Sequence, residues 1–135
     1  MKIKEVVARL HALKYSAKII HWKLTGSRFF ELHKYMDEVA EPIDDFIDDL
    51  MENYFMSEEI ESLKTIEYTF KTDSSEYYVS EYNTPDDMIR NLLEIVIELS
   101  NGIENINTYR GVNAVLDEIS SYLMKVKALL KAYLA

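Results

Sequence analysis

Apolar residues recur at three- and four-residue steps along most of the chain, and no other feature limits its possible folds as strongly. Each residue of an α-helix turns the backbone by about 100°, so this spacing puts the apolar side chains on one face. We therefore predict four helices, over residues 2–23, 28–56, 85–109 and 112–134. A shared core of this kind suits one all-α domain that spans residues 1–135.

Glycine, proline and short polar residues mark the ends of these helices. Gly26 can take the left-handed conformation that closes a helix, and Ser27 is a candidate N-cap for the next one. Thr84 followed by Pro85 is typical of a helix start, with threonine as the N-cap and proline at the first helical position. Gly111 marks the break before the last helix. These residues predict where the second, third and fourth helices begin.

Two stretches depart from the regular helical pattern. Pro42 lies in the middle of the second helix, where it removes a hydrogen bond and should bend the rod. Residues 57–83 carry weak periodicity and many tyrosines, and their first part, 57–66, is compatible with a short helix. The whole stretch is long enough to connect two helices that run parallel.

Two pairs of potential metal ligands lie on the second helix: His33 with Asp37, and Asp48 with Glu52, each pair four residues apart. All four side chains fall within roughly a 100° arc of an ideal helix. Asp37 and Asp48 are eleven residues apart, or about 16 Å along the axis, so the two pairs cannot hold one ion together. Each pair is therefore half of a site.

A second copy of the same helix can complete both half-sites. The midpoint between His33 and Glu52 coincides with the midpoint between Asp37 and Asp48, and this point lies next to Pro42. Two copies packed antiparallel about a two-fold axis there would place Asp37 against Asp48 of the partner subunit. His33 would then face Glu52 of the partner subunit. The sequence thus predicts two equal sites for each dimer.

A fifth candidate ligand, His21, lies in line with the apolar face of the first helix. Each candidate also has a simpler explanation: His21 as a hydrogen-bonded core residue, His33 with Asp37 as a surface pair, and the acids of 44–49 as a solvated face. The metal site is favoured over these explanations because it accounts at once for the residue types, their spacing, their helical face and the two-fold symmetry. The chain has no cysteine, so imidazole and carboxylate would be the ligands, and these suit iron, zinc or manganese.

Over about a quarter of its length the chain resembles the Dps mini-ferritins, in the order His21-Trp22, Gly26, Phe29, His33, Asp37, Asp48 and Glu52. The resemblance implies a ferritin-like four-helix bundle in which residues 57–83 form the long crossover between the second and third helices. It also implies a homo-oligomer, a hollow dodecamer built from two-fold dimers, with a ferroxidase centre at the dimer interface.

The resemblance further implies a role for each ligand. His21 would hold one iron ion together with Asp48 and Glu52 of the partner subunit. His33 and Asp37 would help to bind a second iron ion or a bridging water. The expected reaction is oxidation of Fe²⁺ by hydrogen peroxide, with ferric mineral stored in the shell and protection against oxidative damage. Zinc or manganese would be substitutes for iron.

Trp22, next to the first ligand, has two explanations of equal weight. It could be a packing aromatic residue, or, as the resemblance implies, it could lie beside the iron and take up an oxidising equivalent. On the second explanation Trp22 counts among the catalytic residues. One alternative for the whole protein is a non-catalytic shell that keeps the ligands only as a metal-binding scaffold.

A second alternative, a DNA-compacting protein, is disfavoured by charge. The chain has 15 basic and 24 acidic residues, a net charge of −9, whereas non-specific DNA binding depends on Lys and Arg that neutralise phosphates. A basic flexible tail is not expected either, since the helical pattern extends almost to both ends. The start of the chain is amphipathic and charged, so we expect no secretory signal, no membrane span and a cytoplasmic location.

Overall fold

The computed structural model describes residues 1–58 and 84–135, and all the regular structure in these two ranges is helical. The elements are α1 (Ile3–Lys23), α2 (Phe29–Ala40), α3 (Ile43–Leu50), the π-helix η1 (Met51–Phe55), α4 (Met56–Glu58), α6 (Pro85–Glu104) and α7 (Arg110–Leu134). The predicted crossover over 57–83, with the short helix at its start, lies almost wholly outside the described residues.

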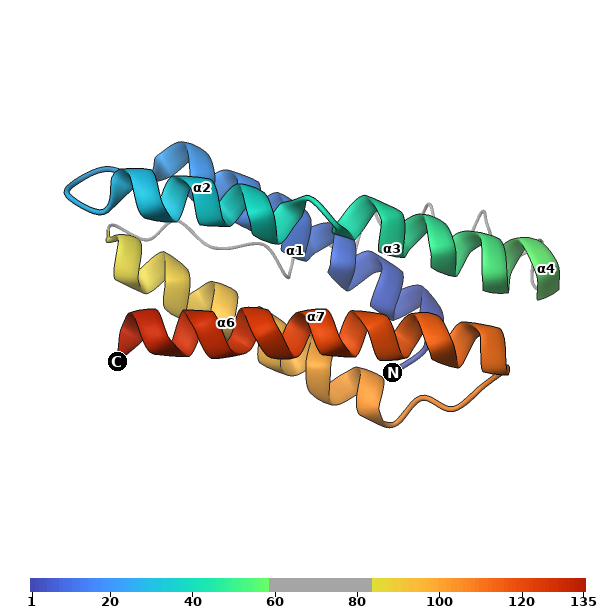
Figure 1. Ribbon diagram of the computed structural model, residues 1–135. Coiled ribbons are helices and arrows are strands. Elements are labelled where there is room, and N and C mark those ends of the chain that lie inside the picture. The colour runs from blue at the N-terminus through green and yellow to red at the C-terminus, as the bar shows by residue number, and fades with distance from the viewer. Residues whose placement is uncertain (59–83) are drawn as a thin grey trace.

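The helices form a four-helix bundle, as the sequence predicted. Figure 1 shows α2, α3 and α4 following one another along one side of the bundle and α7 along the opposite side. The α1 helix packs against α2, α3 and α6, while α7 packs against α6, α3 and η1. No described helix has the length and apolar character needed to cross a membrane.

The predicted apolar faces are the faces that form the core. Residues with no measurable exposure come from every long helix: Leu10, Leu13 and Ile20 of α1, Met36 of α2, Ile43 and Leu50 of α3, Leu92 and Leu99 of α6, and Ile119 and Leu123 of α7. Burying one such side chain contributes about 1.5–3 kcal/mol relative to leaving it exposed. This shared core holds the helices that carry the candidate ligands.

Two predicted helix boundaries are confirmed in detail. Gly26 has φ of +97°, the left-handed conformation expected between the first two helices. Thr84 caps α6, because its hydroxyl oxygen accepts a hydrogen bond from the backbone N–H of Asp87 at 3.2 Å. Pro85 is the first residue of α6.

Two other predicted boundaries are wrong. Arg28, not Ser27, is in the N-cap position of α2, and no side-chain hydrogen bond caps that helix. Gly111 lies inside the first turn of α7, and the break falls earlier, over residues 105–109. The carboxamide of Asn113 shapes this break: it accepts a hydrogen bond from the Thr108 N–H at 2.9 Å and donates one to the Thr108 carbonyl oxygen at 3.1 Å.

The predicted second helix is interrupted at Pro42 rather than merely bent. Proline has no N–H to donate to the carbonyl four residues earlier, so α2 ends at Ala40 and α3 begins at Ile43. The backbone at Glu41 and Pro42 keeps right-handed helical angles, so α3 continues close to the line of α2 (Figure 1). The Tyr122 hydroxyl of α7 donates a hydrogen bond to the Val39 carbonyl oxygen just before the break.

The predicted α-helix also changes type after Leu50. Residues Met51–Phe55 form one π-helical turn, in which the Met56 N–H donates to the carbonyl oxygen of Met51, five residues earlier. The side-chain amide of Asn53 donates a hydrogen bond to the carbonyl oxygen of Asp49 at 2.8 Å. In a regular α-helix this carbonyl would accept from the backbone N–H of Asn53 instead. This competition for one carbonyl gives a local reason for the wider turn that contains Glu52.

Candidate metal centre

A series of side-chain pairs crosses from α1 to the α2–α3 rod, and we call it the cross-helix ladder. In order along α1 it pairs Lys14 with Asp44, Lys18 with Asp37, and His21 with His33. The residue numbers rise on one side of the ladder and fall on the other, because α1 and α2 are antiparallel about the turn at Gly26. Three predicted ligands, His21, His33 and Asp37, therefore lie in two neighbouring rungs of the ladder.

The two imidazoles form a reciprocal pair. The Nδ1–H of His21 donates to the carbonyl oxygen of His33 at 2.6 Å, and the Nδ1–H of His33 donates to the carbonyl oxygen of His21 at 2.8 Å. The two rings stack with their centroids 3.5 Å apart and their planes 17° apart. The ring of Phe29 stacks on His33 with a centroid distance of 4.7 Å. Hydrogen bonds and stacking together fix the orientation of both rings.

These hydrogen bonds also select the ring nitrogen that can bind a metal. A carbonyl oxygen can only accept, so each Nδ1 must carry a proton, and in the neutral ring Nε2 then keeps its lone pair. Ligating histidines in metal sites are oriented in the same way, by donating their second ring N–H to a carbonyl or carboxylate oxygen. His21 and His33 are thus arranged to present Nε2 as the ligand atom.

Asp37 lies on the rung next to the imidazoles. Its carboxylate is exposed and forms an ion pair with the Lys18 ammonium. The hydrogen bond from Lys18 lowers the pKa of Asp37 below its ordinary value, and the positive charge of Lys18 acts in the same direction, while desolvation opposes them. The carboxylate is therefore ionised at neutral pH and available to a cation.

The other two predicted ligands lie further along the rod. Asp48 is exposed on α3, and Glu52 is exposed in η1. The helical rise puts Asp48 about 16 Å beyond Asp37. Within residues 1–58 and 84–135 of one chain, no three His, Asp or Glu side chains are arranged to hold a metal ion. The structure brings together His21, His33 and Asp37 but leaves Asp48 and Glu52 apart from them, so the five-ligand set stays a prediction.

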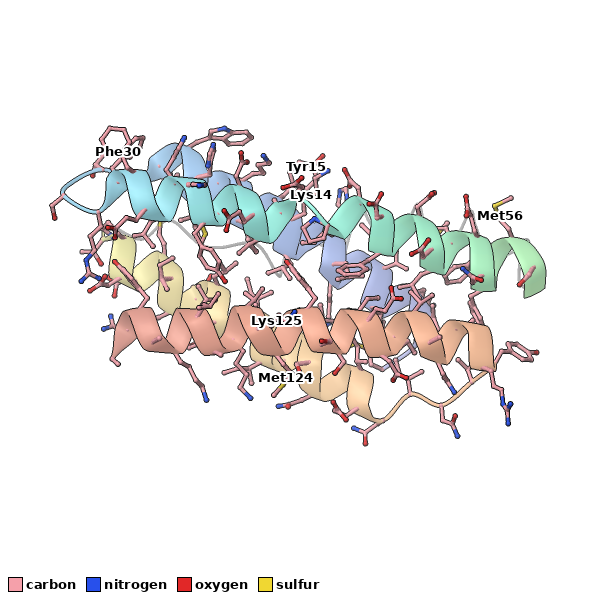
Figure 2. All side chains as sticks on the ribbon, in the orientation of Figure 1. Lys14, Tyr15, Phe30, Met56, Met124 and Lys125 are labelled. Carbon is pink, nitrogen blue, oxygen red and sulfur yellow. The ribbon has the colours of Figure 1, made fainter. Side chains whose placement is uncertain are left out.

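Large apolar side chains are exposed on the same side of the molecule as the ladder. Trp22 directly follows His21 and is 69% exposed, and Phe30, three residues before His33, is 82% exposed. Figure 2 shows Phe30, Tyr15 and Met56 projecting from the α1–α2–α3 side, whereas Met124 and Lys125 belong to α7 on the opposite side. Trp22 is therefore not buried in the core of its own chain. This exposure argues against the first explanation of Trp22, that it packs inside one chain.

The two lysines of the ladder were not among the residues singled out from the sequence. Lys18 precedes His21 by three residues and Lys14 precedes it by seven, so all three share one face of α1. This spacing can be read from the sequence. The pairing of the two lysines with Asp44 and Asp37 cannot, because it depends on the register in which α1 packs against the α2–α3 rod.

Comparison with known proteins gives one family. A model of the ferritin-like domain matches residues 2–111, a range that includes all five candidate ligands. No curated protein and no solved structure matches the chain. At the level of the family, the match supports iron binding, with iron storage or ferroxidase activity.

Proposed function

Since the chain belongs to the ferritin-like family, we propose that it is a Dps-like mini-ferritin that oxidises Fe²⁺ at sites shared between two subunits. On this proposal the oxidant is hydrogen peroxide, and the ferric product is stored inside a hollow oligomer of about twelve chains, as the resemblance implies. The protein would store iron and limit oxidative damage.

One observation carries the proposal: each chain has two separate, incomplete sets of candidate metal ligands, one on each side of the interruption at Pro42. His21, His33 and Asp37 gather at the α1–α2 end, and Asp48 and Glu52 lie beyond the interruption at Pro42. A two-fold axis at that interruption would join each set to the complementary set of a second copy. The donors are imidazole nitrogens and carboxylates, which suit Fe²⁺ and Fe³⁺ and would also accept zinc or manganese.

The exposed apolar surface supports a dimer on this side of the bundle. Trp22, Phe30 and Met56 expose between 59% and 82% of their surface. Exposed apolar side chains of this size near a charged site are typical of surfaces that a partner covers. A second copy packed over α2 and α3 would cover them and bring its own Asp48 and Glu52 toward the imidazoles.

The chemistry follows from the donor set. Two Fe²⁺ ions each give up one electron, and the two electrons break the O–O bond of one hydrogen peroxide molecule. Two hydroxide ions result, and hydrolysis of the Fe³⁺ ions with these and further water gives ferric oxyhydroxide and releases protons. Carboxylates bind Fe³⁺ more tightly than Fe²⁺, so Asp37, Asp48 and Glu52 would favour the oxidised product. Trp22 beside the site would be positioned to take up a stray oxidising equivalent.

The test is anaerobic loading with Fe²⁺ followed by stoichiometric hydrogen peroxide, with ferric formation followed by ultraviolet absorbance and the assembly sized on the same sample. We expect rapid oxidation on a particle of about twelve chains, and its loss in Asp48→Asn. The matched control is Asp45→Asn, which removes the same charge from an exposed acid of α3 that is not a proposed ligand. Oxidation no faster than in buffer, or equal loss in both variants, would contradict the proposal.

A further inference from the structure

We propose that Asn53 is a positioning residue of the metal site: its side chain holds the π-helical turn Met51–Phe55, and this turn sets the direction of Glu52. The inference rests on the function proposed above, because Glu52 is a metal ligand only on that proposal. Asn53 itself would not touch the metal. It would act through the backbone, by keeping Glu52 in line with Asp48 so that both carboxylates reach one ion.

The carboxamide of Asn53 is held at both of its ends. Its nitrogen donates to the carbonyl oxygen of Asp49 at 2.8 Å, so this carbonyl is occupied by a side chain rather than by the backbone N–H of Asn53. Its oxygen faces the first turn of α7, where a Cβ added at Gly111 would lie 4.0 Å away. The η1 turn also packs against α7. The carboxamide therefore lies between its own helix and α7, and both neighbours restrict its rotation.

The burial of Phe55 shows that the wider turn is part of the folded core. Leu50 has no measurable exposure and Phe55 is 2% exposed, although they are five residues apart. A regular α-helix would put these two side chains about 140° apart around its axis, and Tyr54 would follow Leu50 into the core instead. A π-helical turn closes after five residues, so Phe55 is on the buried face and Tyr54 is only partly buried. This segment thus has two possible registers, and it adopts the π-helical one.

The choice of register also moves Glu52. In a regular α-helix Glu52 would lie about 40° around the axis from Asp48, which precedes it by four residues. A π-helical turn rotates the chain less for each residue, so it brings Glu52 closer to a line with Asp48 along the rod. Both side chains are exposed, so the backbone register, and not packing against the core, sets their relative direction. A residue that holds the register therefore also holds the geometry of this half-site.

Ser57 supplies a matched control, because it makes the same kind of hydrogen bond one turn later. Its hydroxyl donates to the carbonyl oxygen of Asn53, four residues earlier, at 2.8 Å. The bond from Asn53 to Asp49 spans Glu52, whereas the bond from Ser57 lies beyond it. Ser57→Ala therefore removes a bond of equal length without freeing the Asp49 carbonyl. A serine can donate to the carbonyl four residues earlier, so Asn53→Ser keeps the donor on a different side chain.

The experiment is anaerobic titration of the assembled protein with Co²⁺ as the probe, comparing wild type, Asn53→Leu, Asn53→Ser and Ser57→Ala. The visible absorption of the bound ion reports its coordination geometry. In Asn53→Leu, which is similar in size but has no donor, Co²⁺ should bind about 10–100-fold more weakly and with a weaker visible band, because loss of a residue that orients a ligand has an effect of this size. Asn53→Ser and Ser57→Ala should both resemble wild type. Helical circular dichroism and assembly size verify that each variant folds.

The possible failures are distinguishable. Unchanged Co²⁺ binding in Asn53→Leu would overturn the inference, and so would Asn53→Ser or Ser57→Ala variants that bind as weakly as Asn53→Leu. If Asp48→Asn abolishes Co²⁺ binding while Asn53→Leu leaves it unchanged, the inference fails and the proposed function stands. Absence of Co²⁺ binding in wild type, or binding that Asp48→Asn does not weaken, would overturn both.

Discussion

His11 is the histidine of α1 that does not belong to the proposed metal site, and its surroundings make it sensitive to pH. Its ring contacts the edge of Tyr15, with a centroid distance of 4.6 Å. Burial lowers the pKa of His11 below 6.5, the charge of Lys14 lowers it further, and the charge of Asp44 acts in the opposite direction. The folded protein therefore resists protonation of this ring.

The consequence is a loss of stability in mild acid. The unfolded chain protonates His11 at its ordinary pKa of 6.5, while the folded chain protonates it only at lower pH. Stability is therefore fully present above pH 6.5 and falls as the pH drops through and below that value. We predict that His11→Gln reduces the difference in urea unfolding free energy between about pH 7.5 and about pH 5. An unchanged difference would show that other groups cause the loss.

At the level of single residues, the sequence singled out candidate ligands but not the hydrogen bonds that hold them, and whether these residues bind metal stays a prediction. Residue type and four-residue spacing identified His33 with Asp37 and Asp48 with Glu52. The reciprocal hydrogen bonds of the imidazoles were not predictable in the same way. They depend on two carbonyl oxygens that face the rings only because α1 and α2 pack in one particular register.

The interruption at Pro42 is a property of the α2–α3 rod that can be tested by stability. Proline inside a helix removes one hydrogen bond, and its ring crowds the carbonyl four residues earlier. The local backbone already has helical angles, so alanine fits there without rearrangement. We predict that Pro42→Ala raises the free energy of unfolding by about 1 kcal/mol, after allowing for the greater freedom of the unfolded chain.

The matched control is Glu41→Ala at the preceding exposed position, where a backbone hydrogen bond to the Asp37 carbonyl oxygen already exists. This change should leave the urea midpoint nearly unaltered. A Pro42→Ala variant that is less stable than wild type would mean that the interruption is stabilised by contacts across the bundle, such as the hydrogen bond from Tyr122 to the Val39 carbonyl oxygen.

The helices themselves were largely predictable, and their irregularities were only partly so. Periodic apolar residues identified every long helix, and Pro42 marked the interruption. The π-helical turn at Met51–Phe55 was not foreseen, because its competing hydrogen bond from Asn53 to Asp49 involves an ordinary exposed side chain. The turn matters because it contains Glu52, so an ideal helical wheel misplaces this candidate ligand relative to Asp48.

Across the whole molecule, tertiary contacts hold the candidate ligands on a well-packed scaffold. Arg9 of α1 forms an ion pair with Glu98 of α6 at 2.6 Å, and buried residues of all four long segments meet in one core. The sequence predicted this bundle and its single core. The division of the candidate ligands into two half-sites stays a prediction. The assembly that would join these half-sites was inferred from symmetry alone.

The central claim is that each metal site contains residues of two subunits, and mixed assemblies test it most directly. His21→Ala removes a ligand from one set and Asp48→Asn removes a ligand from the other, so each variant alone should be inactive. A dimer with one chain of each kind has one doubly damaged site and one intact site. Random mixing makes about half of the dimers mixed, so about a quarter of wild-type peroxide-dependent iron oxidation should return.

The measurement is ferric formation after the two variants are co-expressed and purified as one assembly, compared with each variant alone. Recovery of about a quarter of the wild-type rate is the result that the shared site predicts. A mixed assembly as inactive as its parents would contradict it, because the ligands would then have to come from one chain.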